Sequence, residues 1–204
     1  MVIVLKELME LHSNVIFGGD GYSSEWHTMA VEERGLKNIP TTADALPAFL
    51  DQTVIDLFDS TGVLTPVELK SRYEVYAEQY VLSIEVESKL VVNMAKTMIF
   101  PAAVSYLSDL TDAIGGAAEL SITLDSSVAT AVGENINGMM AAVAKLETAM
   151  ATHDFASTEE HMKFCADTVC GLMLEVRGFA DTLETLVADD VWPLPKYSEM
   201  LFMR

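Results

Sequence analysis

The sequence predicts an all-α fold, an antiparallel bundle of three long helices with shorter N-terminal helices and an extended C-terminal tail. Three long stretches repeat apolar residues every three or four positions, which indicates one buried face on each of three helices. The stretches run over residues 65–114, from Ser121 or Asp125 to about 152, and over residues 157–190. Their connections are short, and short connections between helices reverse the direction of the chain. We therefore expect residues 65–190 to form the bundle, within one domain that covers residues 15–204.

The first 64 residues predict short helices around a glycine-dense loop. Residues 2–12 carry a partial apolar stripe, which favours a short amphipathic helix. Residues 15–64 contain the loop Gly18-Gly19-Asp20-Gly21-Tyr22-Ser23 and then two helical stretches. A glycine loop before a helix can bind phosphate through backbone N–H groups, but the lysine and hydroxyl of a P-loop are missing here. A tight structural turn is the favoured interpretation.

Two short helices are expected after this loop. Ser23 or Ser24 can cap a helix over residues 25–33, which Gly35 would close. A second helix is expected over about residues 43–60, and Gly62 would stop it. Because Pro47 falls in the first turns of this second helix, we expect its start to be displaced or bent.

The longest helix begins with Thr65-Pro66-Val67-Glu68, which combines a hydroxyl at the N-cap, a proline in the first turn and a glutamate three residues after the cap. Its predicted buried face comprises Leu69, Tyr73, Tyr76, Tyr80, Ile84, Val91, Met94 and Met98. Pro101 predicts a kink, because proline lacks a backbone N–H and its ring clashes with the preceding turn. The pair Gly115-Gly116 is expected to end the helix.

The other two long helices each carry one apolar stripe. The stripe of the second comprises Val128, Val132, Ile136, Met139, Val143, Leu146 and Met150, with a near-heptad spacing that is typical of packed helices. The third opens with the capping sequence Ser157-Thr158-Glu159-Glu160. Its stripe comprises Met162, Cys165, Val169, Met173, Val176, Ala180, Leu183 and Val187.

The C-terminal tail, residues 191–204, has a different pattern. Pro193 and Pro195 predict an extended or turn-like chain. Large apolar residues are dense in the tail, and the candidate interface residues are Trp192, Leu194, Tyr197, Leu201 and Phe202. The favoured interpretation is that these side chains anchor the tail on its own bundle, and the alternative is an interface with another subunit or domain.

Acidic residues dominate the composition. The chain has 31 Asp and Glu residues against 12 Lys and Arg residues, which gives a formal charge of -19 and a pI near 4.3. Nucleic acids and anionic membranes need a basic surface, so we expect neither as a partner. A solvated helix surface is the favoured interpretation of this acidity, and a docking face for a basic partner is the alternative.

Neither a membrane span nor a secretory signal is predicted. The mean hydropathy of +0.28 is high, yet no window of about 18 residues is free of charged or strongly polar side chains. The N-terminal run Val2-Ile3-Val4-Leu5 is too short for a signal sequence, and charged residues follow it. We therefore expect a cytoplasmic location.

Signals for catalysis and metal binding are missing from the sequence. None of His12, His27, His153 and His161 belongs to an H-E-x-x-H or Glu-x-x-His pattern of the kind that builds metal sites in helical bundles. His161 and Cys165 share a helix face, but two ligands do not make a zinc site. On an α-helix Cys165 and Cys170 would point about 140° apart, so we expect reduced thiols rather than a mutual disulfide. We expect no catalytic, cofactor-binding or metal-binding residue.

Several segments resemble the C-terminal region of type III glutamine synthetases. The run Val15-Ile16-Phe17-Gly18-Gly19-Asp20-Gly21-Tyr22-Ser23-Ser24-Glu25-Trp26 is similar to the family sequence V-I-F-N-G-N-G-Y-S-x-E-W, with Gly18 and Asp20 in place of asparagines. Further similar segments follow in the family's order: Glu33-Arg34-Gly35-Leu36, Thr42-x-Asp44-Ala45-Leu46-Pro47, Leu69-x-Ser71-Arg72-Tyr73-Glu74, Met94-Ala95 and Trp192-Pro193-Leu194-Pro195-Lys196-Tyr197-x-Glu199-Met200-Leu201-Phe202. These specific matches span nearly the whole chain.

The resemblance implies a segment of a larger enzyme that joins ammonia to glutamate with ATP and a divalent metal, Mg or Mn. It also implies that the nucleotide, metal and glutamate sites lie in other domains, so no catalytic residue of the family is carried onto this sequence. Residues 1–14 would be the end of a preceding catalytic-domain helix, with Met1 an artificial or alternative start. The implied partners are the catalytic domain and the other subunits of a homo-oligomer, since the family forms stacked hexameric rings.

Three hypotheses follow. The leading one is a non-catalytic C-terminal helical domain of a type III glutamine synthetase that serves subunit architecture, assembly or regulation. The alternative is a free-standing acidic helical-bundle adaptor that binds a protein partner. A metal-dependent bundle enzyme is a third hypothesis, which the missing Glu-x-x-His pairs disfavour.

Overall fold

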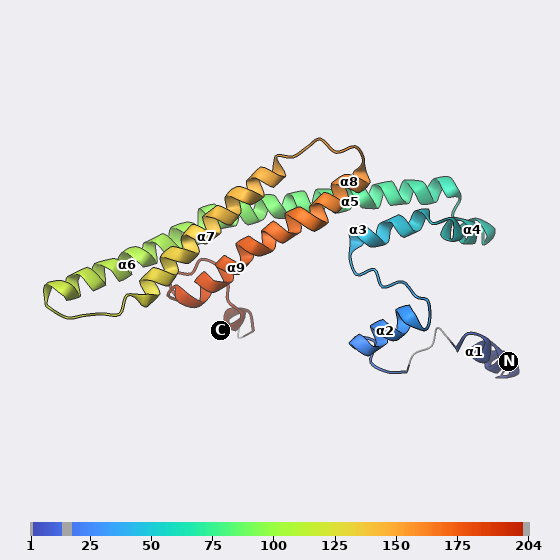
Figure 1. Ribbon diagram of the computed structural model, residues 1–204, viewed down its shortest axis with the longest axis horizontal. Helices are drawn as coiled ribbons and strands as arrows, with labels where there is room; N and C mark the ends of the chain where they lie inside the picture. The colour runs from blue at the N-terminus through green and yellow to red at the C-terminus, as the bar shows by residue number, and fades with distance from the viewer. Residues whose placement is uncertain (1, 14–17, 202–204) are drawn as a thin grey trace. The chain divides into compact units, whose positions relative to one another are not determined.

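The computed structural model describes residues 2–13 and 18–201 (Figure 1). The chain divides into two compact units, Met1–Ala45 and Leu46–Arg204, and each is considered by itself. Over the described residues all regular structure is helical and no strand is present. The predicted all-α class is therefore confirmed.

The described residues of the first unit form the helices α1 (Val2–Leu11), α2 (Ser24–Glu32) and α3 (Thr42–Ala45). The short N-terminal helix that the sequence predicts is confirmed as α1, which has no buried residue. Several hydrogen bonds form the turn before α2. The Asp20 carboxylate accepts a bond of 2.9 Å from the Tyr22 N–H, and the Ser23 hydroxyl accepts one of 3.2 Å from the Trp26 N–H. The loop therefore uses its polar groups to start a helix, as the turn interpretation predicts.

The second unit begins with the 3₁₀-helix η2 (Leu46–Leu50) and α4 (Gln52–Ser60). The single helix predicted over about residues 43–60 is therefore wrong, whereas the displaced start expected from Pro47 is confirmed, because α4 begins only at Gln52. Pro47 cannot donate the backbone hydrogen bond that an α-helix needs at its position, and Asp51 has the extended angles φ -62° and ψ 133°. Gly62, at φ 66°, ends α4 as predicted, because the Val63 N–H can then reach the Phe58 carbonyl at 3.0 Å.

A continuous helix of 54 residues, Pro66–Glu119, is the longest element of the second unit. It comprises α5 (Pro66–Met94), the π-helical turn η3 (Ala95–Ile99) and α6 (Phe100–Glu119). The predicted capping box is confirmed, since the Thr65 hydroxyl accepts from the Glu68 N–H and the Glu68 carboxylate accepts from the Thr65 N–H. The Thr65 N–H and the Thr65 hydroxyl both donate to the Glu68 carboxylate, and these two bonds hold the pKa of Glu68 below its usual range.

A π-helical turn stands where the sequence predicts a kink. The Phe100 N–H donates to the Ala95 carbonyl, five residues back, directly before Pro101. This wider turn changes the hydrogen-bond register at the point where the proline supplies no N–H.

The predicted end of the long helix is wrong. Gly115 and Gly116 lie inside α6, which ends at Glu119, and Ser121 then takes a left-handed φ of 59°. The Ser121 N–H donates to the Ala118 carbonyl at 2.9 Å, and the Ile122 N–H donates to the Ala117 carbonyl at 2.9 Å. These two bonds form a Schellman motif, which satisfies the last carbonyls of the helix without a glycine.

Two further long helices follow. The first is α7 (Ser127–Met150), and the second comprises α8 (Thr158–Phe164), the π-helical turn η4 (Cys165–Val169) and α9 (Cys170–Leu186). Figure 1 shows the chain turning back after α6 and again after α7. The helix α7 packs against both α6 and α9, and α5 packs against α8 and η2. The third long helix ends at Leu186, four residues earlier than predicted, where Val187 becomes extended.

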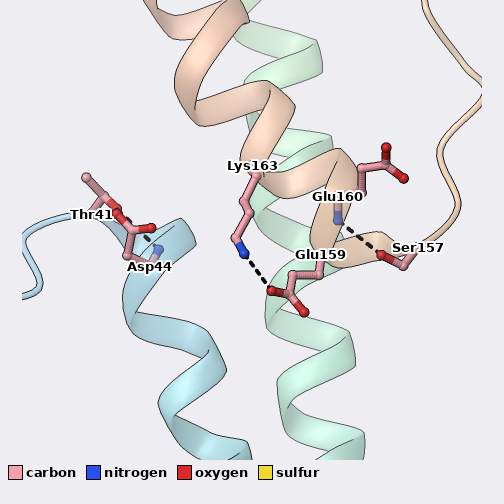
Figure 2. A network of polar contacts seen from close by, with 6 residues as sticks. All are labelled: Thr41, Asp44, Ser157, Glu159, Glu160 and Lys163. Atoms are coloured by element: carbon pink, nitrogen blue, oxygen red, sulfur yellow. Dashed lines mark hydrogen bonds and ion pairs between the residues drawn. The ribbon is translucent and has the colours of Figure 1, made fainter.

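The start of α8 is fixed by its own side chains. Figure 2 shows the Ser157 hydroxyl accepting from the Glu160 N–H at 3.1 Å, and Lys163 paired with Glu159 at 2.7 Å. The Glu160 carboxylate accepts from the Ala156 N–H at 2.7 Å, so the predicted capping sequence does cap this helix. Figure 2 also shows the start of α3, where the Thr41 hydroxyl accepts from the Asp44 N–H at 3.2 Å.

The core of the second unit uses small residues as well as large ones. Its fully buried side chains include Leu69, Ala77, Ala95, Ala103, Val132, Met139, Ala142, Leu146, Met162 and Leu183. Small side chains let helix backbones approach closely, and larger ones from the neighbouring helix fill the space beside them.

The helix Pro66–Glu119 is the one helix among the described residues that is long and apolar enough to cross a membrane by length and composition. Its apolar window has a mean hydropathy of 1.4, and 17% of that window is buried. Core helices of soluble proteins pass the same test.

Candidate functional site

An open cavity of about 400 Å³ lies between α5 and the start of α8. We call it the acidic groove, and its lining includes Glu78, Leu82, Glu85, His153, Phe155 and His161. The helix α5 supplies the first three of these residues, at a spacing that places them along one side of a helix. The connection 151–157 and α8 supply the other three. Carboxylates therefore face a wall of ring side chains.

Rings form a stacked pair in the groove. The Phe155 and His161 rings have centroids 4.2 Å apart and planes inclined by 10°. The Phe164 ring also contacts Phe155, with centroids 5.2 Å apart. His161 Nε2 is 3.8 Å from Glu85 Oε1. The stack fixes the connection after α7 against the first turn of α8, because aromatic contacts of this size favour one arrangement of the chain.

The two glutamates of the groove have different surroundings. Glu85 lies between His161 and Lys89, whose Nζ is 3.7 Å from Glu85 Oε2. Glu78 is exposed and forms no ion pair within the described part of the chain. The groove therefore keeps a net negative charge that is concentrated near Glu78.

A thiol and phenol cluster lies deeper, where η4 meets α5. Burial raises the pKa of the Cys165 thiol to about 11, and burial together with a hydrogen bond to Cys170 raises the pKa of Tyr80 to about 12. Both cysteines are free thiols, as expected. The predicted separation of 140° between the two cysteine side chains around the helix is wrong. The Cys170 N–H donates to the Cys165 carbonyl across a π-helical turn, which places the two residues on adjacent turns of one helix face.

The described residues contain no group of three or more His, Cys, Asp or Glu side chains that could hold a metal ion. His161 faces Glu85 of the acidic groove, whereas Cys165 is buried beside Tyr80 and Cys170. The side chains in this part of the chain therefore do not fit a divalent metal.

The predicted interface residues of the tail have different environments. Trp192 is buried with 8% exposure, and its indole N–H has no acceptor among the described residues. Leu194 is half-buried and Leu201 is exposed. The structure does not describe the Tyr197 side chain, and Phe202 lies outside the described residues. An interface through these five residues stays a prediction.

The sequence predicts an extended or turn-like tail, but part of the tail is helical. It contains the short helix α10 (Tyr197–Leu201), because the Glu199 carboxylate accepts from the Lys196 N–H at 2.9 Å and caps a turn after Pro195. The Lys196 ammonium also pairs with Asp189 at 2.6 Å.

Two helix faces carry exposed apolar side chains. On α1 they are Val2, Ile3, Val4, Leu5, Leu8, Met9 and Leu11, with exposures from 48% to 80%. On α5 they include Val75, Leu82, Val86 and Leu90, which we call the outer stripe. The buried face predicted for the long helix does not include the outer stripe, although the spacing of seven, four and four residues is visible in the sequence.

Over the described residues, these features define an all-α protein whose accessible surface includes the apolar faces of α1 and α5 and the acidic groove. A family model described as the glutamine synthetase C-terminal domain matches residues 1–117. The chain belongs to this family.

Relatives match nearly the whole chain. It is 34% identical to a type-3 glutamine synthetase of Dictyostelium discoideum, 32% identical to a glutamine synthetase of Butyrivibrio fibrisolvens and 30% identical to a glutamine synthetase of Bacteroides fragilis strain YCH46. Each comparison covers 98% of this chain but only 28% or 29% of the relative. The chain thus spans less than a third of the length of the synthetases that it matches.

Proposed function

We propose that this domain works as the non-catalytic C-terminal part of a type III glutamine synthetase and serves the architecture and assembly of its subunits. The observation that carries the proposal is the asymmetry of the matches, which cover 98% of this chain and 28% to 29% of each synthetase. The full-length enzyme would join ammonia to glutamate in the cytoplasm. ATP and Mg or Mn would bind in the remainder of that polypeptide.

The exposed face of α1 supports a role in packing between parts of a larger protein. All ten residues of α1 lack burial, although seven of them are large and apolar. Burial of apolar surface contributes roughly 25 cal/mol per Å², so an uncovered apolar helix gains stability when another surface covers it. We propose that the preceding catalytic domain or a neighbouring subunit covers α1 in a homo-oligomeric enzyme.

The decisive experiment removes the region that corresponds to residues 18–204 from a type III glutamine synthetase. Ring assembly is followed by light scattering and glutamine formation by a product assay, with and without this chain added in trans. The expected result is loss of assembly that the added chain restores. If the truncated enzyme assembles and works as well as the full-length enzyme, the architectural role is wrong.

A matched pair of variants tests the α1 surface in a full-length synthetase that carries this domain. Leu5→Ser with Leu8→Ser removes exposed apolar side chains and is expected to weaken assembly. Glu7→Ser with Glu10→Ser changes neighbouring exposed polar positions on the same helix and serves as the control. Equal assembly of the two variants would refute the role of α1.

A further inference from the structure

We propose that the acidic groove and the outer stripe together bind a basic amphipathic helix of another protein, with one Lys or Arg side chain of that helix held in the groove. This interaction does not depend on the assembly role of the domain. It uses α5 and α8, whereas the assembly proposal uses α1.

The groove has the groups that recognise a cationic side chain. Glu78 is exposed, and the Glu85 side chain keeps 38% exposure although it lies beside His161 and Lys89. Hydrogen bonds between a carboxylate and a guanidinium or ammonium are stronger than those between neutral groups. Phe155 adds a ring face in the same cavity, and ring faces attract cations. A volume of about 400 Å³ leaves room for a long side chain.

The outer stripe extends this site along α5. Leu82 belongs to both the groove and the stripe, and Val86 and Leu90 follow at intervals of four residues. The exposures are 55% for Val75, 61% for Leu82, 57% for Val86 and 53% for Leu90. Apolar side chains at this spacing pack against a facing helix, so the occupant that fits the stripe is itself an apolar helix face.

Charge decides which helix fits. Three glutamates, Glu74, Glu78 and Glu85, lie within about 80° of Leu82 around α5. The bases on that side of the helix are Arg72 and Lys89. A second copy of this chain would carry the same net charge of -19 to the interface, and like charges repel. A helix with Lys or Arg beside its apolar face would instead be attracted, which increases its association rate and selects it over acidic helices.

The first test measures binding of a synthetic probe. The probe is a fluorescein-labelled helical peptide with leucines at heptad a and d positions and arginines beside them, and the control peptide has glutamates in place of the arginines. Fluorescence anisotropy during titration with the 204-residue chain should show binding of the arginine peptide that weakens as salt increases. Equal binding of both peptides would overturn the proposal.

Variants of the chain locate the site. Glu78→Gln with Glu85→Gln is expected to weaken binding of the arginine peptide by roughly tenfold, because two ion pairs in a partly enclosed site are lost. Glu119→Gln with Glu134→Gln removes the same charge from exposed positions on α6 and α7 and is expected to change affinity by less than about twofold. If this control weakens binding as much as the groove variant, the attraction is general and the groove is not the site.

The stripe needs its own variant and a readout of self-association. Leu82→Ser with Val86→Ser should weaken binding of the arginine peptide while leaving the circular-dichroism melting curve nearly unchanged, since both side chains are exposed. Light scattering of the unliganded chain should show no self-association through this face. A dimer that the Leu82→Ser and Val86→Ser changes dissociate would mean that a second copy, and not a basic helix, occupies the stripe.

Discussion

Among the glycines of the described residues, Gly138 on α7 is the one at which an added Cβ would meet the closest neighbouring atoms. A Cβ atom at this position would lie 2.3 Å from the Phe179 ring of α9. The ring therefore occupies the place of the missing side chain. Such small-to-large contacts set the distance between α7 and α9, the two helices that share the most extensive contact in this unit.

Gly138→Ala is expected to lower the free energy of unfolding by about 1 to 3 kcal/mol, because the Phe179 ring must move out of its packed position. Gly178→Ala is the matched control. A Cβ at this position of α9 has no atom within 4 Å, so alanine should raise stability by about 0.5 to 1 kcal/mol through its higher helix propensity. Urea denaturation of both variants checks the prediction, and equal effects of the two substitutions would contradict it.

Burial of Cys165 makes stability depend on alkaline pH. The pKa of its thiol is about 11 in the folded chain and 9.0 ordinarily. The folded chain thus keeps a proton that the unfolded chain releases, so this contribution to stability is complete below pH 9 and is lost as pH rises towards 11. Denaturation at pH 8 and pH 10.5 should show a decrease that is smaller in Cys165→Ala. A decrease of the same size in this variant would assign the effect to other groups.

The sequence predicts most of the apolar stripes correctly but misplaces the centre of the longest one. On α7, Val132, Ile136, Met139, Val143 and Leu146 are buried as predicted. On the long helix, Tyr76 is 40% exposed, whereas Ala77 and Ser88 are buried. The predicted stripe is built from large apolar and aromatic side chains, but a close helix approach selects small side chains. Which face allows that approach depends on the neighbouring helix and is not encoded locally.

At the scale of the helix, the two Schellman motifs offer a comparison. Gly62 and Ser121 occupy the same left-handed position after α4 and after α6, with φ of 66° and 59°. A left-handed conformation costs a residue with a side chain about 1 to 2 kcal/mol, and glycine avoids this cost.

Ser121→Gly is therefore expected to raise the free energy of unfolding by about 0.5 to 1 kcal/mol, after allowance for the greater freedom of glycine in the unfolded chain. Gly62→Ala should lower it by about 1 kcal/mol for the same reason. Thermal unfolding of both variants by calorimetry gives the answer. A shift of the same sign in the two variants would contradict the conformational explanation.

Helix starts are better predicted than helix interiors, for a physical reason. The Thr65 and Ser157 caps are local, because each cap bonds atoms within three residues of itself. The π-helical turns η3 and η4 are different. Pro101 accounts for a defect near η3, but no residue of η4 marks the wide turn at Cys165–Val169 in the sequence. Packing of α8 and α9 over a common core decides that register.

At the scale of the whole molecule, the candidate groove lies beyond the reach of local patterns. It brings Glu78 and Glu85 to the Phe155 and His161 pair from a segment about 70 residues distant in the chain. The acidic charge and the positions of the helix starts can be predicted from the sequence, but the contact between these two segments cannot. The length and path of the connection 151–157 determine which side chains meet, and neither follows a periodic rule.

Removal of the N-terminal helices should leave the second unit stable. In a chain shortened to begin at Pro40, the melting temperature is expected to change by less than about 4 °C, because α1 has no buried residue and α2 has one, Ala30.

Trp192→Ala, by contrast, should lower the stability of the full chain by about 3 kcal/mol through loss of a buried ring. Calorimetry of both proteins checks this, and a large loss on shortening would show that the first unit supports the second.

The length of Pro66–Glu119 also gives the domain a mechanical property. At 1.5 Å per residue the helix extends about 80 Å, and the part after η3 forms an arm of roughly 30 Å. Rotation of this arm by about 10° at η3 would carry its tip through roughly 5 Å, the height of one helical turn. The wide turn before Pro101 thus lies where a small change of angle would become a larger displacement of the end of α6 and of α7 packed on it.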